Sequence, residues 1–372
     1  MNNWKEFTLG DIIKFGNGKE RPKTVGIIPI FGGNGILGYC DKSNYNDETI
    51  IIGRVGAYCG SVFYQNNSIW ISDNALSAKP KTNFNTKFLF YFLKNLRLNY
   101  FAEGSSHPLV TQSLLNSIEV FITDSISEQN NIAEILSSLD DKIDLLHRQN
   151  KTLEQIAETL FRQWFVEEAD DGWEEKKFED ILDLQRGISY TSKSLGEYGN
   201  GIPMHNLNSI DIYGRYKYEG IKYYTGEIKE KQKLVAGDLL IINTDITQDN
   251  RIIGWPIFVP DNYSESVCTH HLYSVLLNTE KVTKLYLYFL LRHREYREEL
   301  ANASNGTTVS MLSKNAIGNV KIKIPPEIKR KDFESIVSEL MAKQTLNQKQ
   351  IQTLTKLKDT LLPKLMSGEV KV

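Results

Sequence analysis

The sequence predicts an α+β protein in which two duplicated α/β globular units are separated by two long helices that pair as an antiparallel coiled coil. Three observations lead to this prediction. Segments of the chain recur in the same order, two stretches carry a seven-residue apolar repeat, and the remainder alternates short β-branched runs with turn residues. A length of 372 residues also suits two domains.

The internal repeat sets the expected domain boundaries. Residues 86–93 (TKFLFYFL) return as residues 283–290 (TKLYLYFL). Further pairs keep the same order: residues 4–13 with 173–182, 104–106 with 306–308, and 153–161 with 354–362. We therefore expect a first globular unit at 1–123, a central helix at 124–167, a second globular unit at 168–325 and a distal helix at 326–372.

Each globular unit is predicted to combine strands with a helix. Apolar β-branched runs such as residues 48–53 and 239–242 predict strands, because they are short and bounded by turn residues. The aromatic runs at 88–101 and 285–300 predict a helix that packs against each sheet.

The two helical stretches show apolar residues at alternating spacings of four and three, which is typical of a coiled coil. The positions expected to pair the helices are Leu139, Ile143, Leu146, Asn150 and Leu153 in the first stretch and Leu340, Asn347, Ile351 and Leu354 in the second. An antiparallel register in which facing residue numbers sum to 497 places Asn150 opposite Asn347 and Trp164 opposite Phe333. Each amide in the seam then has a polar partner.

Charge also favours this pairing, since residues 124–167 carry −5 and residues 326–372 carry +3. Pro363 predicts a kink or an end near the C-terminus of the distal helix. The alternative is that each helix packs only on its own globular unit. Packing of that kind does not explain a heptad pattern sustained over more than four repeats.

Motifs that resemble enzyme signatures fail on their context. Residues 33–38 match a dinucleotide-binding glycine pattern, but the following residues are turn-like where that motif requires a helix. Cys268, His270 and His271 suggest zinc, but no second ligand pair lies at a suitable spacing, so a strand end is the preferred interpretation. The sequence also lacks a methyltransferase motif and a nuclease carboxylate cluster. We therefore predict a non-catalytic chain without a metal site or cofactor of its own.

Several loops instead carry side chains suited to DNA. Arginine can bind guanine through two hydrogen bonds and amides can bind adenine, while hydroxyl groups and backbone amides contact phosphates. A glycine-rich loop holds Arg54 and Tyr58, and a polar loop follows the predicted strand 239–242. The candidate DNA-binding residues are Arg54, Tyr58, Ser105, Ser106, His107, Asn243, Thr244, Asp245, Thr247, Gln248, Arg251, Thr307 and Thr308. Any one of these loops taken alone could be an ordinary polar turn, but they recur at matching places in both copies.

The chain resembles the specificity subunits of type I restriction-modification enzymes over essentially its whole length. The resemblance is most specific at residues 135–143 (ILSSLDDKI), 160–165 (LFRQWF), 306–326 (GTTVSMLSKNAIGNVKIKIPP) and 361–369 (LLPKLMSGE). Residues 51–60 and 237–245 are similar to target-recognition segments of that family. One departure is at residues 127–131 (SEQNN), where the second copy has Lys329, Arg330 and Lys331.

This resemblance implies a division of labour among subunits. Each target-recognition domain is expected to read half of a bipartite DNA sequence, and the helices to dock two methyltransferase subunits. S-adenosylmethionine, ATP and magnesium would belong to the methyltransferase and restriction subunits. The rival reading is a coiled-coil adaptor whose twin domains bind protein or glycan. Net charge is −2, so DNA binding would depend on localised loops rather than on a basic surface.

The sequence also bears on the compartment. It shows no charged-then-apolar leader and no apolar run of the roughly 20 residues that a membrane span requires. Three scattered cysteines form no disulfide pattern. We therefore expect a cytoplasmic protein that is not bound to a membrane.

Overall fold

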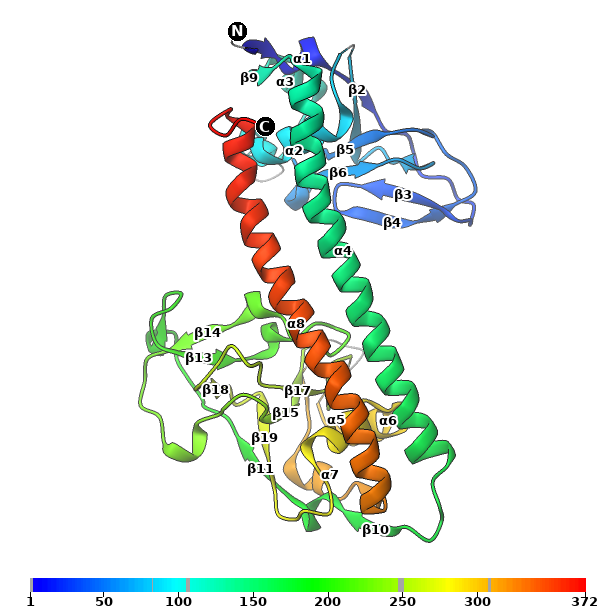
Figure 1. Cartoon of the computed structure of the whole chain (residues 1–372), viewed down its shortest axis with the longest axis vertical. Helices are drawn as coiled ribbons and strands as arrows, with labels where there is room; N and C mark the ends of the chain where they lie inside the picture. Colours follow the sequence, from blue (N-terminus) through cyan, green and yellow to red (C-terminus); the bar gives the residue numbers. More distant parts are fainter. Residues whose placement is uncertain (1–2, 82, 105–107, 247–250, 307–308) are drawn as a thin grey trace. The chain divides into compact units, whose positions relative to one another are not determined.

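The computed structural model describes residues 3–81, 83–104, 108–246, 251–306 and 309–372. It divides into two compact units, which we call unit 1 (Met1–Asn150 with Thr345–Val372) and unit 2 (Lys151–Gln344). Each unit contains one globular region and parts of two long helices, α4 (Ile126–Arg162) and α8 (Glu327–Met366) (Figure 1). The helices are therefore divided between the two units.

Unit 1 is built on an antiparallel sheet with the strand order β2-β8-β5-β6. Its strands are β2 (Ile13–Asn17), β8 (Ala75–Pro80), β5 (Thr49–Gly53) and β6 (Val62–Gln65). A second sheet contains β3 (Ile28–Gly32), β4 (Gly35–Cys40) and β7 (Trp70–Ile71), and β1 (Trp4–Thr8) pairs with β9 (Glu119–Thr123). The helices are α1 (Leu9–Ile12), α2 (Thr86–Leu96) and α3 (Gln112–Ser117).

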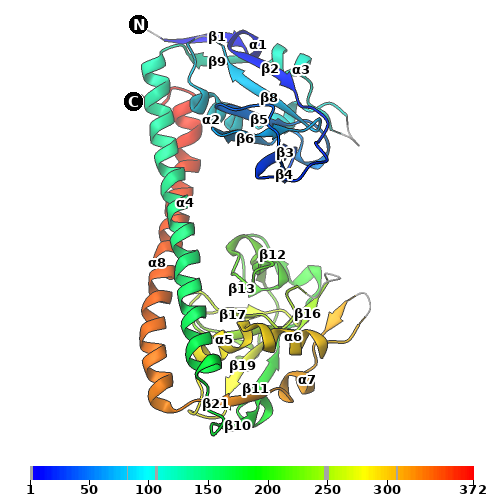
Figure 2. The same cartoon turned by 90° about the vertical axis from the view of Figure 1, so that its right-hand side faces the viewer.

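Unit 2 repeats this arrangement with the order β11-β19-β15-β17. These strands are β11 (Leu182–Arg186), β19 (Leu272–Leu277), β15 (Leu239–Ile242) and β17 (Pro256–Phe258). A second sheet holds β12 (Leu195–Gly196), β14 (Lys222–Tyr224), β13 (Ile202–His205) and β18 (Val267–Cys268). Two short pairs are β10 (Glu174–Lys177) with β21 (Lys321–Ile324), and β16 (Thr244–Asp245) with β20 (Ser310–Met311). The helices are α5 (Lys284–Arg292), α6 (Arg294–Asn302) and α7 (Lys314–Gly318) (Figure 2).

The prediction of a duplicated α+β fold is confirmed by this match in strand order. The central strands β5 (TIIIG) and β15 (LLII) are buried along their whole length, which explains why both are apolar runs rather than alternating ones. Helices α2 and α5 begin alike, because the side chains of Asn85 and Thr283 each accept a hydrogen bond from the backbone N–H three residues on.

The long helices run antiparallel within each unit. In unit 1 the Asn347 Nδ2 donates to Asn150 Oδ1 at 2.9 Å, which is the amide pair that the 497 register places together. In unit 2 the ring centroids of Trp164 and Phe333 lie 6.2 Å apart in an edge-on arrangement. An ion pair between Lys358 of α8 and Asp140 of α4 extends the seam in unit 1.

Pro363 does not end α8, which continues to Met366. The end predicted near Pro363 therefore comes three residues later, and the alternative of a kink stays a prediction. A proline removes one backbone hydrogen bond, that to the carbonyl four residues earlier, and less than one helical turn follows it here. Gly368, with a φ of 73°, follows the helix where a left-handed residue is usual.

No helix within the described ranges is both long enough and apolar enough to span a membrane.

Candidate nucleic-acid interface

In unit 1, three loops are tied together at the end of the central strand β5. The backbone N–H of Arg54, the residue after β5, donates to the carbonyl of Asn74 at 3.0 Å. Its carbonyl accepts from the N–H of Val110 at 2.9 Å. Arg54 therefore joins the loop after β7 to the loop before α3, and we call these three positions the loop frame of unit 1.

Unit 2 has the same loop frame at the end of β15. The N–H of Asn243 donates to the carbonyl of His271 at 3.0 Å, and its carbonyl accepts from Leu312 at 2.8 Å. Asn243 and Arg54 thus occupy the same structural position. The duplication extends beyond the core to the loops where recognition residues were predicted.

A glycine completes each frame. The N–H of Gly60 donates to the carbonyl of Gly53 at 2.8 Å, and that of Gly254 donates to Ile242 at 2.9 Å. Both glycines are left-handed, with φ of 82° and 73°. A Cβ on Gly60 would lie 2.3 Å from the backbone nitrogen of Asn99, so a side chain does not fit.

A further loop in each unit carries predicted residues that lie outside the described ranges. Glu103 and Leu109 exchange backbone hydrogen bonds of 3.0 and 2.9 Å, as Asn305 and Met311 do at 2.9 and 2.8 Å. The loops closed by these bridges are therefore matched in position. They contain the candidates Ser105, Ser106, His107, Thr307 and Thr308, which are not described.

In unit 1, the structure places both predicted reading residues at the surface of the frame. Tyr58 is 53% exposed. Arg54 is half-buried, and its Nε is covered without a hydrogen-bond partner among the described residues. Both side chains are therefore placed where a ligand could reach part of them.

In unit 2, three of the predicted DNA-binding residues lie inside the loop. Asn243, Thr244 and Asp245 are buried, at 1% exposure or less. Asn243 Nδ2 donates to the carbonyl of His270 at 3.1 Å, and Thr244 Oγ1 donates to Asn243 Oδ1 at 2.7 Å. Asp245 Oδ2 accepts from the N–H of Ile252 at 2.7 Å. These side chains shape the loop from inside and do not face a ligand.

Arg251 is exposed, as is Ile246, while Thr247 and Gln248 lie outside the described ranges. The carbonyl of Arg251 accepts from Trp255 Nε1 at 2.8 Å and from Arg297 Nη2 at 3.0 Å. The Arg297 guanidinium stacks on the Trp255 ring at 3.6 Å. Burial, and then the neighbouring Arg292, lower the pKa of Arg297 to about 10.

Arg292 connects this arrangement to α4 within unit 2. Its guanidinium is 4% exposed and contacts Glu154 at 2.5 Å and Glu158 at 2.9 Å. It also lies over the Trp255 ring at 4.8 Å and the Tyr288 ring at 5.3 Å. Burial alone would lower the pKa of Arg292, but Tyr288 and the two carboxylates outweigh it and raise that pKa.

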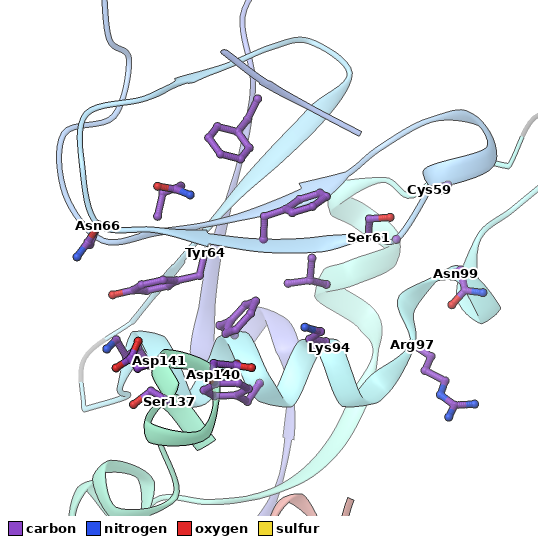
Figure 3. Close-up of a pocket in the computed structure, with 18 of the residues that line it drawn as sticks. Cys59, Ser61, Tyr64, Asn66, Lys94, Arg97, Asn99, Ser137, Asp140 and Asp141 are labelled. Atoms are coloured by element: carbon purple, nitrogen blue, oxygen red, sulfur yellow. Dashed lines mark hydrogen bonds between the residues drawn. The ribbon is translucent and has the colours of Figure 1, made fainter. Parts of the chain in front are cut away.

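Unit 1 has a cleft of about 850 Å³ between β6, α2 and α4 (Figure 3). Tyr91 and Lys358 both donate to Asp140 on its α4 side, at 2.7 and 2.6 Å. Ser61 lies on the opposite wall, next to the frame glycine. The residue next to the frame glycine of unit 2 is Trp255, so the two otherwise matching units differ here by a large aromatic side chain.

The sequence predicts a strand end at His270 and His271, and β18 does end just before Thr269. It did not connect them to the loop frame. Alignment of the two copies on β18 and β7 would have matched His271 with Asn74, but the second copy has insertions that hide this match in the sequence. Among the described residues, no group of three His, Cys, Asp or Glu side chains could hold a metal ion.

The fold and the loop frames define a duplicated recognition protein, with two similar surfaces in one chain. A family model described as the type I restriction modification DNA specificity domain matches residues 1–155 and 170–356. The chain therefore belongs to the type I restriction-modification specificity family. This membership confirms the predicted class, a specificity subunit that is not itself the catalytic component.

Similar proteins agree with this assignment. The chain is 27% identical over 343 residues to the type I restriction enzyme MjaIX specificity subunit of Methanocaldococcus jannaschii, covering 84% of this chain and 76% of that protein. It is 22% identical to the type I restriction enzyme HindI specificity subunit of Haemophilus influenzae, over the full length of both. The crystal structure of a type I restriction-modification S subunit from M. genitalium matches with a TM-score of 0.67 and 19% identity, over 98% of this chain and 97% of that chain.

Proposed function

We propose that this chain is the subunit through which a type I restriction-modification complex reads a bipartite DNA target, with one half of the target contacted by each unit. The observation that carries the proposal is the loop frame. The same backbone hydrogen bonds hold Arg54 in unit 1 and Asn243 in unit 2, and the exposed side chains around them differ. A common frame with different side chains suits recognition of two different half-sites.

We further propose that methyltransferase subunits bind to the long helices. Four apolar side chains on the long helices are 39–49% exposed to water, namely those of Leu145, Ile156, Leu346 and Leu357. Leu346 and Leu357 follow Leu145 and Ile156 by the same 201 residues that separate the two helical copies. Repetition of an exposed apolar pattern supports two similar docking surfaces, and thus two copies of one partner.

The partners would supply the chemistry. In this proposal S-adenosylmethionine is bound by the methyltransferase subunits, and ATP and magnesium by restriction subunits, in the cytoplasm where the DNA lies. The residues of this chain would contribute binding and orientation only.

The test is to express the chain with its methyltransferase partner in a host without adenine methylation and to map methylated adenines across the genome. We expect a two-part motif with an unspecific gap. Methylation without a motif, or a motif in one continuous part, would refute the proposal. A twin-domain adaptor for protein or glycan would instead show no DNA affinity that falls steeply with salt.

A further inference from the structure

We propose that unit 2 binds DNA phosphates through a side-chain cluster, which consists of the cations Arg186 and Lys222 and the imidazoles of His270 and His271. The inference rests on the proposed function and assigns a contact surface that the sequence did not indicate. It places this surface beside Asn243, in the loop that follows β18.

The cluster is held together by backbone contacts. The rings of His270 and His271 lie with centroids 3.9 Å apart. Arg186, the last residue of β11, donates from Nε to the carbonyl of His270 at 3.1 Å. The same loop supports Asn243, which bonds to the carbonyls of both histidines. Arg186, His270 and His271 thus lie at the edge of the loop frame. Lys222 lies on β14, whose neighbour β13 pairs with β18 just before the histidines.

Arg186 and Lys222 give the cluster a positive charge that no ion pair among the described residues offsets. Neither Arg186 nor Lys222 forms an ion pair within the described part of the chain, and Lys222 Nζ contacts the Tyr190 hydroxyl at 2.8 Å instead. Burial, followed by His270, Arg186 and Lys222, lowers the pKa of His271 to about 4. Arg186 and Lys222 are the positive charges of the cluster, although residues 168–325 carry −3 as a whole. A local field of this sign favours an anion.

The histidines have unused hydrogen-bonding capacity. The Nδ1 atoms of His270 and His271 are covered and have no hydrogen-bond partner among the residues described. Both rings are nevertheless partly exposed. The two partly exposed imidazoles lie beside the exposed Arg186 side chain, and DNA phosphates are acceptors that arginine and lysine bind well.

Unit 1 shows that the fold does not require this cluster. Strand pairing aligns the two units residue by residue, including the parallel bridges of Lys19 with Ser72 and of Ile188 with Thr269. The positions that match Arg186, Lys222, His270 and His271 in unit 1 are Asn17, Gly38, Asp73 and Asn74. They are neutral or acidic. A structural role common to both copies would not tolerate this change of charge, whereas two surfaces that contact different DNA segments would.

The experiment uses the unit 1 residues as replacements. The full chain, assembled with its methyltransferase partner, carries Arg186→Asn, Lys222→Asn or the pair His270→Asp and His271→Asn. Binding is measured on a duplex that contains the mapped motif, on single-base variants of each half, and on a scrambled duplex, over a series of salt concentrations. Lys229→Asn, an exposed lysine of unit 2 outside the cluster, is the matched control. Thermal unfolding verifies that each variant is folded.

We expect Arg186→Asn and Lys222→Asn to weaken binding by a similar factor on every duplex, and to reduce the slope of log affinity against log salt by about one each. The histidine pair is expected to lower affinity more strongly, because it adds a negative charge. The control is expected to leave both quantities unchanged.

The outcomes separate the two proposals. If the unmodified complex binds the motif duplex no better than the scrambled one, the proposed function fails. If it does discriminate and folded cluster variants retain both affinity and salt slope, the phosphate site is refuted. A loss on the motif duplex that disappears on a single-base variant of one half would also overturn it, since that pattern belongs to base contacts.

Discussion

The amide pair in the coiled coil allows an asymmetric test of its energetics. Asn347 is fully buried, its Oδ1 has no hydrogen-bond partner among the described residues, and its Nδ2 bonds to Asn150 at 2.9 Å. Asn150 is only partly buried, so water can reach it. When its partner is removed, Asn150 can therefore bond to water, whereas the Asn347 amide stays buried.

Replacing Asn150 by Leu leaves the buried Asn347 amide with only a weak contact to Gln149 at 3.5 Å. An unsatisfied buried amide costs about 1–3 kcal/mol, so we expect Asn150→Leu to destabilise unit 1 by about 1–2 kcal/mol. Asn347→Leu removes the buried amide together with its unsatisfied oxygen and adds apolar burial. We expect it to stabilise, and the double substitution to stabilise by about 2 kcal/mol, or roughly 4–8 °C.

The assay is calorimetric unfolding of the full chain, combined with hydrogen exchange of residues 140–150 and 345–355 to assign the change to this region. Gln155→Leu, at an exposed position of α4, is the control and is expected to change stability by less than about 0.5 kcal/mol. A neutral or stabilising effect of Asn150→Leu would show that leaving the buried Asn347 amide without its partner costs little, and would refute the expectation. Faster exchange in the more stable double variant would indicate that the pair secures the register.

Three further predictions concern other parts of the chain. Burial lowers the pKa of His205 from 6.5 to about 3, so between these pH values the unfolded chain binds a proton that the folded chain excludes. The stability of unit 2 is therefore expected to fall as pH drops from about 6.5 toward 3, by at most about 1.4 kcal/mol per pH unit. Urea unfolding at a series of pH values should show a flatter profile for His205→Gln. Arg292→Ala removes a buried guanidinium and leaves Glu158 without this ion pair, while Glu154 keeps Arg215 at 3.2 Å, so we expect a cost of about 1.5–3 kcal/mol in the same assay. Arg294→Ala, whose side chain is 85% exposed, is expected to cost less than about 1 kcal/mol, and equal costs would contradict the importance of burial. Arg54→Ala is expected to relax the sequence specificity of methylation only in the half-site of unit 1. Replacement of residues 1–123 by the corresponding part of a relative is expected to change the same half of the motif only. A change in both halves would show that the units are not independent.

The sequence by itself determined the duplication, the alternation of sheet and helix, and the register of the long helices. These features depend on local periodicity. A heptad repeat with one asparagine in each copy admits few alignments, and the register that pairs Asn150 with Asn347 is apparent from residue numbers alone. The class of protein followed from segments such as residues 306–326, whose resemblance extends over many consecutive positions.

Only the tertiary structure decided which loop residues face outward. Asn243, Thr244 and Asp245 have side chains suited to DNA, but their loop turns inward and uses them for its own hydrogen bonds. Arg186 and His270 are 84 residues apart and meet through the pairing of β11 with β19, a contact that no local pattern encodes. The orientation of a polar side chain depends on which distant strand supplies its backbone neighbours. The sequence therefore predicted candidate recognition loops, and the long-range pairing of strands determined which of their residues are exposed.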